Sequence, residues 1–286
     1  MNSIGSAPGK DIGFIEPLRW YALGGHSMTG MFEIIETFKL GNGGQTRFAR
    51  SILSDYRGHL RMNTSVEKVE QRHGGVTVTT KDGDSLKARA IVCTIPLNCL
   101  GDIKFSPPLS PQRQEAIKLG HMNKGVKIHY KLRKAEPAFF SMANGYGKSP
   151  LCFAFSDHTG TGRNTGKGTY CIGFGYNNYL YNRDATTDII LGFADYMRPD
   201  SDVEGYATHD WVSDPFAKGA WSCWGPSGMS KHLAELQKAH GRVFMANADW
   251  ANGWRGFIDG AIERGSVAAA EVRKLLQGDA QAAAKL

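Results

Sequence analysis

The best candidate for chemistry in this sequence is a glycine-framed segment near its end, GFIDGA at 256–261. It begins the last predicted helix, 257–276, and the free backbone N–H groups at a helix start favour negative charge on a bound group. Gly256 and Gly260 would let another molecule approach the backbone closely. The same spacing also suits a helix that merely packs on a sheet, so both interpretations stay open.

A second candidate is Lys127, within the alternating stretch VKIHYKL. Alternation predicts a strand with Val126, Ile128 and Tyr130 on one face and Lys127 and His129 on the other. The apolar face should be buried. By itself, the pattern suggests that Lys127 faces solvent.

Several nucleotide and hydrolase motifs are excluded by counting. In 160–169 (GTGRNTGKGT), five residues separate Gly160 from Gly166 and Lys167 precedes a glycine, so the stretch predicts a mobile loop rather than a phosphate loop. The glycines of 41–44 and 173–175 fail the GxGxxG spacing. Residues 25–29 do not complete a GxSxG elbow.

Cysteine and histidine spacing gives no sign of a disulfide framework or a metal site. The nine histidines include no HExxH or HxxxH pair. The five cysteines are odd in number and form no CxxC pair, so we expect buried free thiols; they are Cys93, Cys99, Cys152, Cys171 and Cys223. We therefore expect no metal.

Composition indicates a soluble globular protein, with 41% hydrophobic and 21% charged residues. The net charge of +7 comes from interspersed charges rather than a basic cluster, which argues against nucleic acid binding. No apolar run approaches the roughly 18 residues that span a bilayer, and the first 20 residues lack a secretory pattern. We expect an intracellular protein without a membrane partner.

Hydrophobic periodicity predicts a mixed order of helices and strands. A helical hairpin is expected over 12–38, broken at Gly24-Gly25, and a helix near 45–56. A three-stranded meander follows from Ser65, with SLKARAIVCTIP as its third and central strand. The further expected helices are one capped by Ser110, 186–197, 228–240 and 257–276, and the further strands 151–156, 169–175, 206–212 and 242–248.

The sequence resembles the carboxy-terminal part of the flavin-dependent amine oxidases, most closely fungal monoamine oxidases that hold FAD noncovalently. The blocks that carry the resemblance occur in the same order as in that family: KLGNGGQTRFAR, VCTIPLNCL, FSPPLS, GHMNKGVKIHYKL, DPFAKGAW and RVFMANADWANGWRGFIDGAIERG. One departure is large, since the family begins with a GxGxxG βαβ unit that this chain lacks. The chain resembles roughly the last three fifths of such an enzyme.

The resemblance implies roles for individual residues. Trp221 and Phe257 match the family's aromatic pair, two parallel rings that orient a neutral amine; taken alone, each is an ordinary core aromatic. Lys127 matches the lysine that holds a water against the reactive flavin nitrogen. The implied cofactor contacts are Val66 at the adenine, Asp249 at the ribityl chain in place of the usual Glu, and Trp254 and Ile258. Ala220 stands where covalent members carry the flavin-linking cysteine.

The fold implied is α/β, a partial amine-oxidase fold without the amino-terminal Rossmann βαβ unit. Residues 39–103 and 241–280 would form the FAD-binding portion. Residues 1–38 and 104–240 would form an α+β substrate portion.

The implied activity is FAD-dependent oxidation of an amine to an imine, with dioxygen reduced to hydrogen peroxide. Two alternatives remain open because the pyrophosphate site is missing: a noncatalytic remnant or binding module, and one half of a split oxidase completed by another polypeptide. A small-molecule amine and dioxygen are the expected partners, with a homo-oligomer also possible.

The final residues, Ala284-Lys285-Leu286, match the small-basic-leucine form of the peroxisomal address. The preceding GDAQAAA would leave this end unfolded and accessible, although an alanine-rich helix end is the alternative. A peroxisomal location is expected, and otherwise a cytoplasmic one.

Overall fold

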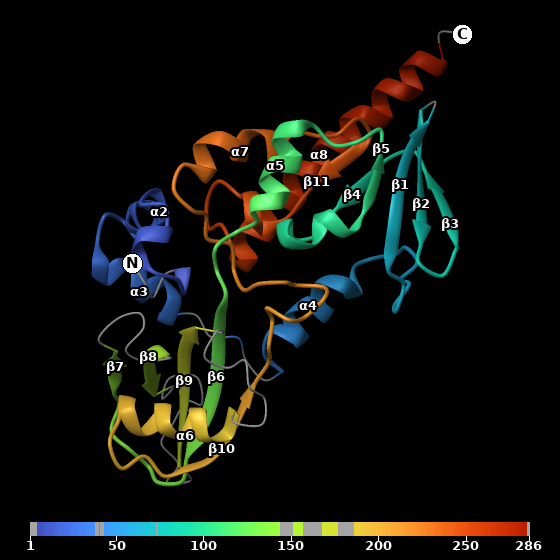
Figure 1. Ribbon diagram of the computed structural model, residues 1–286. Helices are drawn as coiled ribbons and strands as arrows, with labels where there is room; N and C mark the ends of the chain where they lie inside the picture. The colour runs from blue at the N-terminus through green and yellow to red at the C-terminus, as the bar shows by residue number, and fades with distance from the viewer. Residues whose placement is uncertain are drawn as a thin grey trace.

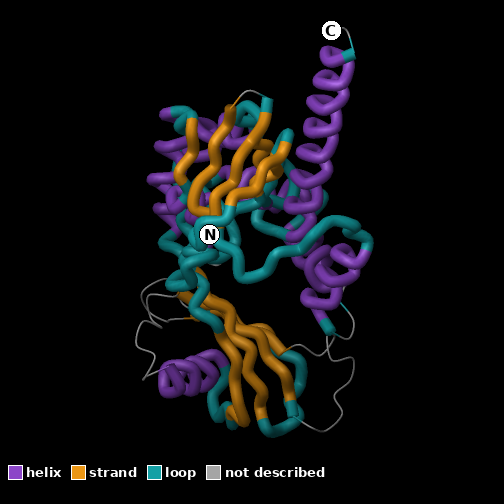
Figure 2. Tube along the Cα trace, turned by 90° about the vertical axis from the view of Figure 1, so that its right-hand side faces the viewer, coloured by secondary structure: helices purple, strands orange, loops and turns teal. Residues whose placement is uncertain are grey.

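A computed structural model describes residues 5–37, 40, 43–72, 74–143, 151–156, 168–176 and 186–284. Figure 1 shows two β-sheets at opposite ends of the molecule, with helices packed beside each. The view in Figure 2 separates the same two regions, a helix-rich one above and a second sheet with a single helix below. The mixed α/β class expected from the sequence is confirmed.

The amino-terminal helices form the expected hairpin. After a short turn of 3₁₀ helix at Gly9–Asp11, α2 spans Ile15–Leu23 and α3 spans Met28–Thr37. The chain reverses at Gly25, whose φ of 72° lies in the left-handed region that glycine adopts without strain. The next helix, α4, spans Gly44–Ser54, close to the predicted 45–56.

The first sheet has four strands in the order β3-β2-β1-β5. β1 (Val66–Arg72), β2 (Gly75–Thr80) and β3 (Ser85–Ala88) are antiparallel neighbours, as the meander pattern predicts. β5 (Lys104–Ser106), which the sequence did not indicate, pairs with β1 in parallel. The Asp82-Gly83 turn is confirmed by a φ of 89° at Gly83.

The predicted third strand is wrong as one element. It divides after β3, and its apolar end becomes β4 (Ile91–Cys93), which pairs in parallel with β11 (Val243–Met245) as a separate two-stranded sheet. β4 is therefore not the centre of the meander. The physical reason is the buried partner: all three residues of β11 are buried, and pairing with it satisfies the β4 backbone.

Helices cover this region and share one apolar core with the first sheet. α5 (Pro111–Leu119) begins at Ser110, whose hydroxyl accepts from the Arg113 N–H, so the predicted cap is confirmed. This core joins the four-stranded sheet and the β4–β11 pair to α5, α7 (Gly228–Gln237) and the loop at Trp224. Its buried members are Val69, Val76, Cys93, Leu97, Leu100, Ala116, Trp224, Leu236, Val243, Met245 and Trp250. The remaining elements are the 3₁₀ turns Leu97–Asp102 and Ala248–Trp250, α7 (Gly228–Gln237) and α8 (Ile258–Ala283).

The second sheet has five strands in the order β10-β6-β9-β8-β7. α6 (Thr186–Met197) covers one face, where a second core forms around Val126, Ile128 and Tyr130. The strands are β6 (Gly125–Leu132), β7 (Phe140–Met142), β8 (Leu151–Ser156), β9 (Thr169–Tyr176) and β10 (Val203–Thr208). The prediction of a strand at 206–212 is wrong in its bounds, because His209 to Val212 leave the sheet for a loop and turn.

The carboxy-terminal helix is longer than predicted. α8 continues through GDAQAAA to Ala283, so the expectation that this stretch is unfolded is wrong, as alanine's high helix propensity explains. Figure 1 shows its last turns projecting beyond the sheets. Lys285, Leu286 and nearly all of the glycine-rich stretch at 160–169 lie outside the described residues.

Three expectations concern chemistry outside the fold itself. All five cysteines are buried thiols. In the described part of the chain, no group of three or more His, Cys, Asp or Glu side chains could hold a metal ion. Within the same residues, no helix is both long and apolar enough to cross a membrane.

Candidate active site

Lys127 lies on the face of the second sheet opposite α6. Its neighbours Val126, Ile128 and Tyr130 are buried in the core, which confirms the alternation predicted from VKIHYKL. Lys127 itself is half-buried, and its Nζ lies 5.5 Å from the ring centroid of Phe174, its cross-strand partner on β9. A charged amine over a ring face is attracted by the ring's quadrupole, so Lys127 is held by an aromatic surface.

Trp221 contacts the same phenylalanine. Its ring lies edge-on to Phe174, with centroids 5.7 Å apart and planes at 81°. Phe174 also stacks on Phe153 at 4.8 Å. Phe174 thus joins the predicted lysine to one member of the predicted aromatic pair. The sequence reasoning missed it, although its place in the strand at 169–175 was the available signal.

Phe257 belongs to a different group of rings. It lies 5.2 Å from Trp20 on α2 and 5.4 Å from Trp254, while Trp20 and Trp254 are 6.4 Å apart. Phe257 thus contacts Trp20 and Trp254, whereas Trp221 contacts Phe174, and the parallel pairing of Phe257 and Trp221 stays a prediction. Trp20 carried no functional signal in the sequence.

The backbones of the two aromatic segments nevertheless touch. Gly256 has a φ of 81°, and a Cβ built there would lie 3.3 Å from Trp221 Cβ and 3.0 Å from Ser222 N. A side chain at 256 would push these segments apart. The glycine spacing predicts a close approach to the backbone at this point, and in the structure it is the Trp221–Ser222 segment that makes this approach.

The start of α8 carries backbone amides without a capping side chain. Phe257 is the N-cap residue and makes no side-chain cap bond, so the first amides of the helix lack the usual capping acceptor. Ile258 is 42% exposed, which leaves this end accessible. A helix start with open amides favours a bound group that carries or gains negative charge.

Asp249 and Val66 lie in the first core region. Asp249 is buried, and its Oδ2 accepts a hydrogen bond from Leu97 N at 2.8 Å. That bond draws the carboxylate toward the backbone that follows β4. Val66 begins β1 and packs partly buried against the first core. The cofactor contacts predicted for Val66, Asp249, Trp254 and Ile258 stay predictions.

A set of buried polar atoms precedes β6. His121 Nδ1, Asn123 Nδ2 and Ser6 Oγ are buried without a hydrogen-bond partner among the described residues. Burial lowers the pKa of His121, which therefore stays neutral near pH 7. Unpaired buried groups are costly unless water or a ligand satisfies them, so these atoms are available to a bound polar molecule.

Cys223 is two residues beyond Trp221 and is buried. Burial, with the Glu16 carboxylate nearby, raises the pKa of its thiol to about 12. The thiol is protonated at physiological pH and is a poor nucleophile. With Ala220 at the family's linking position, this segment offers no reactive thiolate for a covalent flavin bond.

The family model for flavin-containing amine oxidoreductases matches residues 11–273. A pseudooxynicotine dehydrogenase from a Pseudomonas species is 33% identical over 270 residues, 94% of this chain and 53% of that protein. A nicotine dehydrogenase from Pseudomonas putida is 33% identical over 263 residues, 91% of this chain and 52% of that protein. This chain thus spans about half the length of these relatives. Both are bacterial, so the narrower resemblance to fungal enzymes stays a prediction.

Solved structures give the same fold. A putrescine oxidase bound to putrescine superposes with a TM-score of 0.68 at 17% identity, over 81% of this chain and 53% of that one. Cyclohexylamine oxidase from Brevibacterium oxydans gives 0.66 at 21% identity, over 82% and 53%. The likeness confirms a partial amine-oxidase fold. The chain belongs to the flavin-containing amine oxidoreductase family.

Proposed function

We propose that this chain carries the substrate end and the flavin-ring end of an FAD-dependent amine oxidase. The observation that carries the proposal is the contact of two segments at Gly256, one bearing Trp221 and the other Phe257, beside the open start of α8. Lys127 joins this arrangement through Phe174. Together they bring an aromatic surface, a cation and a helix start to one region.

In the proposed reaction, the amine loses two electrons and two protons and becomes an imine. Bound FAD would supply the two-electron acceptor, and dioxygen would then take up two electrons and two protons to give hydrogen peroxide. Water hydrolyses the imine to an aldehyde or ketone and releases ammonia or an amine. Trp221 and Phe257 orient the neutral amine and exclude water, and Lys127 holds the water that assists reoxidation.

The dioxygen step is tested through Lys127 in a fusion protein. We define the fusion as residues 1–286 joined to the part of the Pseudomonas pseudooxynicotine dehydrogenase that this chain does not span. In it, Lys127→Met should slow reoxidation by dioxygen about a hundredfold and leave reduction by amine unchanged, because one preorganised charge is lost. Stopped-flow absorbance measures both steps.

Lys131→Met is the matched control for Lys127→Met. Lys131 lies on the same face of β6, with its Nζ 5.8 Å from the Tyr170 ring and 2.6 Å from Glu204. Lys131→Met should leave the rates of flavin reduction and reoxidation unchanged. Equal effects of the two substitutions would refute the role of Lys127. Two relatives are named dehydrogenases, whereas a third, from Paenarthrobacter nicotinovorans, is named an oxidase. The reoxidation rate therefore also tests whether dioxygen is the electron acceptor.

We expect noncovalent flavin, because Cys223 is buried and protonated and Ala220 has no thiol. Acid precipitation of the flavin-loaded fusion should release all flavin into the supernatant. A pellet that keeps the yellow colour would contradict this prediction.

One half of a split oxidase is a second candidate, favoured by two exposed apolar surfaces. Ile52 and Leu53 of α4 are exposed, and Val92 of β4 is 43% exposed although parallel sheets are usually covered on both faces. Further polypeptide from a second chain would cover them. The complementary half, produced separately, should then co-elute with this chain and bind FAD; two unassociated halves would exclude this candidate.

The peroxisomal location remains a proposal that rests on Ala284-Lys285-Leu286. With a fluorescent protein at its amino terminus, the chain should form puncta that coincide with a peroxisomal marker in a fungal cell. Deletion of Leu286 should disperse them, because the receptor reads the final residues. Diffuse fluorescence from the intact chain would refute the proposal.

A further inference from the structure

A buried carboxylate on α2 contacts both segments that carry the proposed aromatic pair. Glu16 is 1% exposed. Its Oε1 accepts from the Trp224 N–H at 3.2 Å and from Arg255 Nη1 at 3.4 Å. Trp224 lies three residues after Trp221, and Arg255 lies two residues before Phe257. One oxygen therefore bonds both segments.

The carboxylate is also the counter-ion of two arginines. Arg255 is buried, and its Nε donates to Ala251 O at 3.0 Å. Arg19 Nη2 donates to Glu16 Oε2 at 2.9 Å, and its Nη1 donates to Gly253 O. Burial lowers the pKa of Arg255 to about 10, Arg19 acts in the same direction, and Glu16 opposes both. Without the charge of Glu16, two guanidinium groups would face each other with little water between them.

The same face of α2 contacts the aromatic rings. Trp20 follows Glu16 by four residues, so the two side chains share a helix face. The Trp20 ring lies 5.2 Å from Phe257 and 6.4 Å from Trp254. Helix α2, which carries the Glu16 carboxylate, thus also packs through Trp20 on Phe257, the ring that Glu16 would position.

We infer that Glu16 is a positioning residue, which fixes the spacing of Trp221 and Phe257 by tying Trp224 and Arg255 to one carboxylate. Its consequence for turnover rests on the proposed function. The tie between the two segments does not rest on the proposed function, because Glu16, Trp224 and Arg255 all belong to this chain and are bonded in its structure.

Hydrogen exchange measured by mass spectrometry on the chain tests the tie directly. Glu16→Gln keeps the shape and an acceptor but removes the charge. Exchange in peptides covering 221–225 and 251–257 should accelerate together by about tenfold, as expected for local opening, while the strand at 125–132 stays unchanged. A general loss of stability would accelerate exchange in that strand as well.

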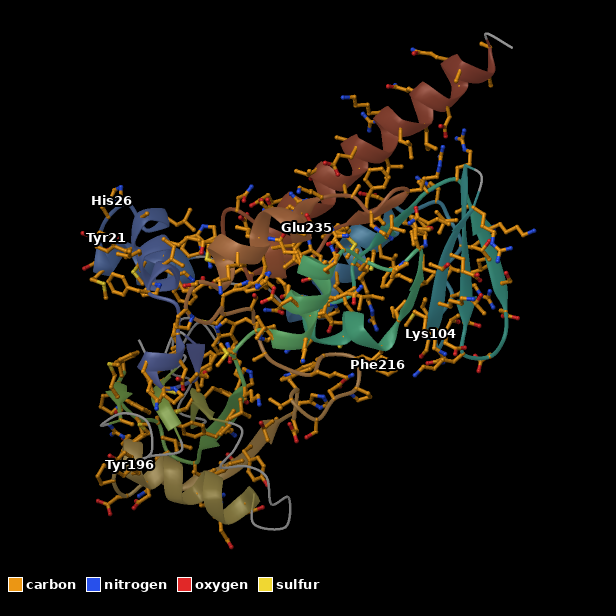
Figure 3. The ribbon with its side chains drawn as sticks, turned by 45° about the horizontal axis from the view of Figure 1, so that its top comes forward. Tyr21, His26, Lys104, Tyr196, Phe216 and Glu235 are labelled. Carbon is orange, nitrogen blue, oxygen red and sulfur yellow. The ribbon has the colours of Figure 1, made fainter. Side chains whose placement is uncertain are left out.

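Glu235→Gln is the matched control. Glu235 on α7 is also largely buried and accepts from Ser110 Oγ at 2.6 Å and Lys238 Nζ at 3.0 Å. Figure 3 shows it well apart from Tyr21 and His26, which mark the α2–α3 hairpin. This variant should leave exchange at 221–225 and 251–257 unchanged.

Three results would overturn the inference: uniform acceleration, acceleration in one segment alone, and no acceleration. If Glu16→Gln does not fold, Glu16→Asp serves instead, because it keeps the charge but is one methylene shorter, which withdraws the carboxylate from both Trp224 N and Arg255 Nη1. The same paired acceleration is expected.

In the fusion, Glu16→Gln should lower kcat/KM about tenfold at unchanged flavin content. A fusion that lacks activity before substitution would contradict the proposed function and leave the exchange result standing.

Discussion

Trp221→Ala in the fusion should lower kcat/KM for amines about a hundredfold and leave the flavin content unchanged. The ring is expected to orient the amine rather than hold the cofactor, and loss of orientation near the reacting atoms typically costs about that factor. Steady-state kinetics with several amines, together with the visible flavin spectrum, measure the two effects separately.

Trp211→Ala provides the control for Trp221→Ala. Trp211 lies ten residues earlier, is exposed, and its ring contacts His209 at 4.3 Å. Its loss should change neither kinetics nor flavin content. Unchanged kcat/KM for Trp221→Ala across all amines would rule out the assigned role, and loss of flavin would make Trp221 a cofactor contact instead.

The second large effect concerns stability, where the same substitution should act in opposite directions at two glycines of α8. A Cβ at Gly260 would lie 2.4 Å from Trp254 O and 2.8 Å from Ala251 Cβ, so Gly260→Ala must displace the backbone of the site. Overpacking of this kind costs about 1–3 kcal/mol of unfolding free energy. Urea unfolding of the chain measures it.

Gly265, one turn and a half further along α8, has open space where its Cβ would stand. Gly265→Ala should therefore raise the unfolding free energy by up to about 1 kcal/mol, through helix propensity alone. If both variants gain stability, the close approach of the α8 start to Trp254 is contradicted.

Local patterns in the sequence predicted most of the elements, because the interactions that specify them are local. The alternation around Lys127 gave the correct buried face of β6, and Ser110 with the following proline gave the start of α5. Local patterns could not predict that the third strand divides into β3 and β4. The partner of β4 is β11, about 150 residues later, and Arg89-Ala90 carries no glycine or proline to mark a break.

The candidate site divides in the same way. Lys127, Trp221 and Phe257 were found through the resemblance, since their own sequence patterns favoured a solvent-facing lysine and core aromatics. Glu16 and Arg255 were missed because they are 239 residues apart, and no periodicity connects charges at that separation. A glutamate in the first turn of a helix also has an ordinary explanation, the helix dipole.

The most direct test of the proposed function is anaerobic mixing of the flavin-loaded fusion with amines. The panel comprises nicotine, pseudooxynicotine, putrescine and cyclohexylamine, the compounds named for similar proteins. We predict that at least one amine bleaches the visible band of the oxidised flavin, and that Trp221→Ala slows the bleaching. A fusion whose spectrum shows bound flavin, but whose flavin no amine reduces, would contradict the claim that this chain carries the substrate end of an amine oxidase.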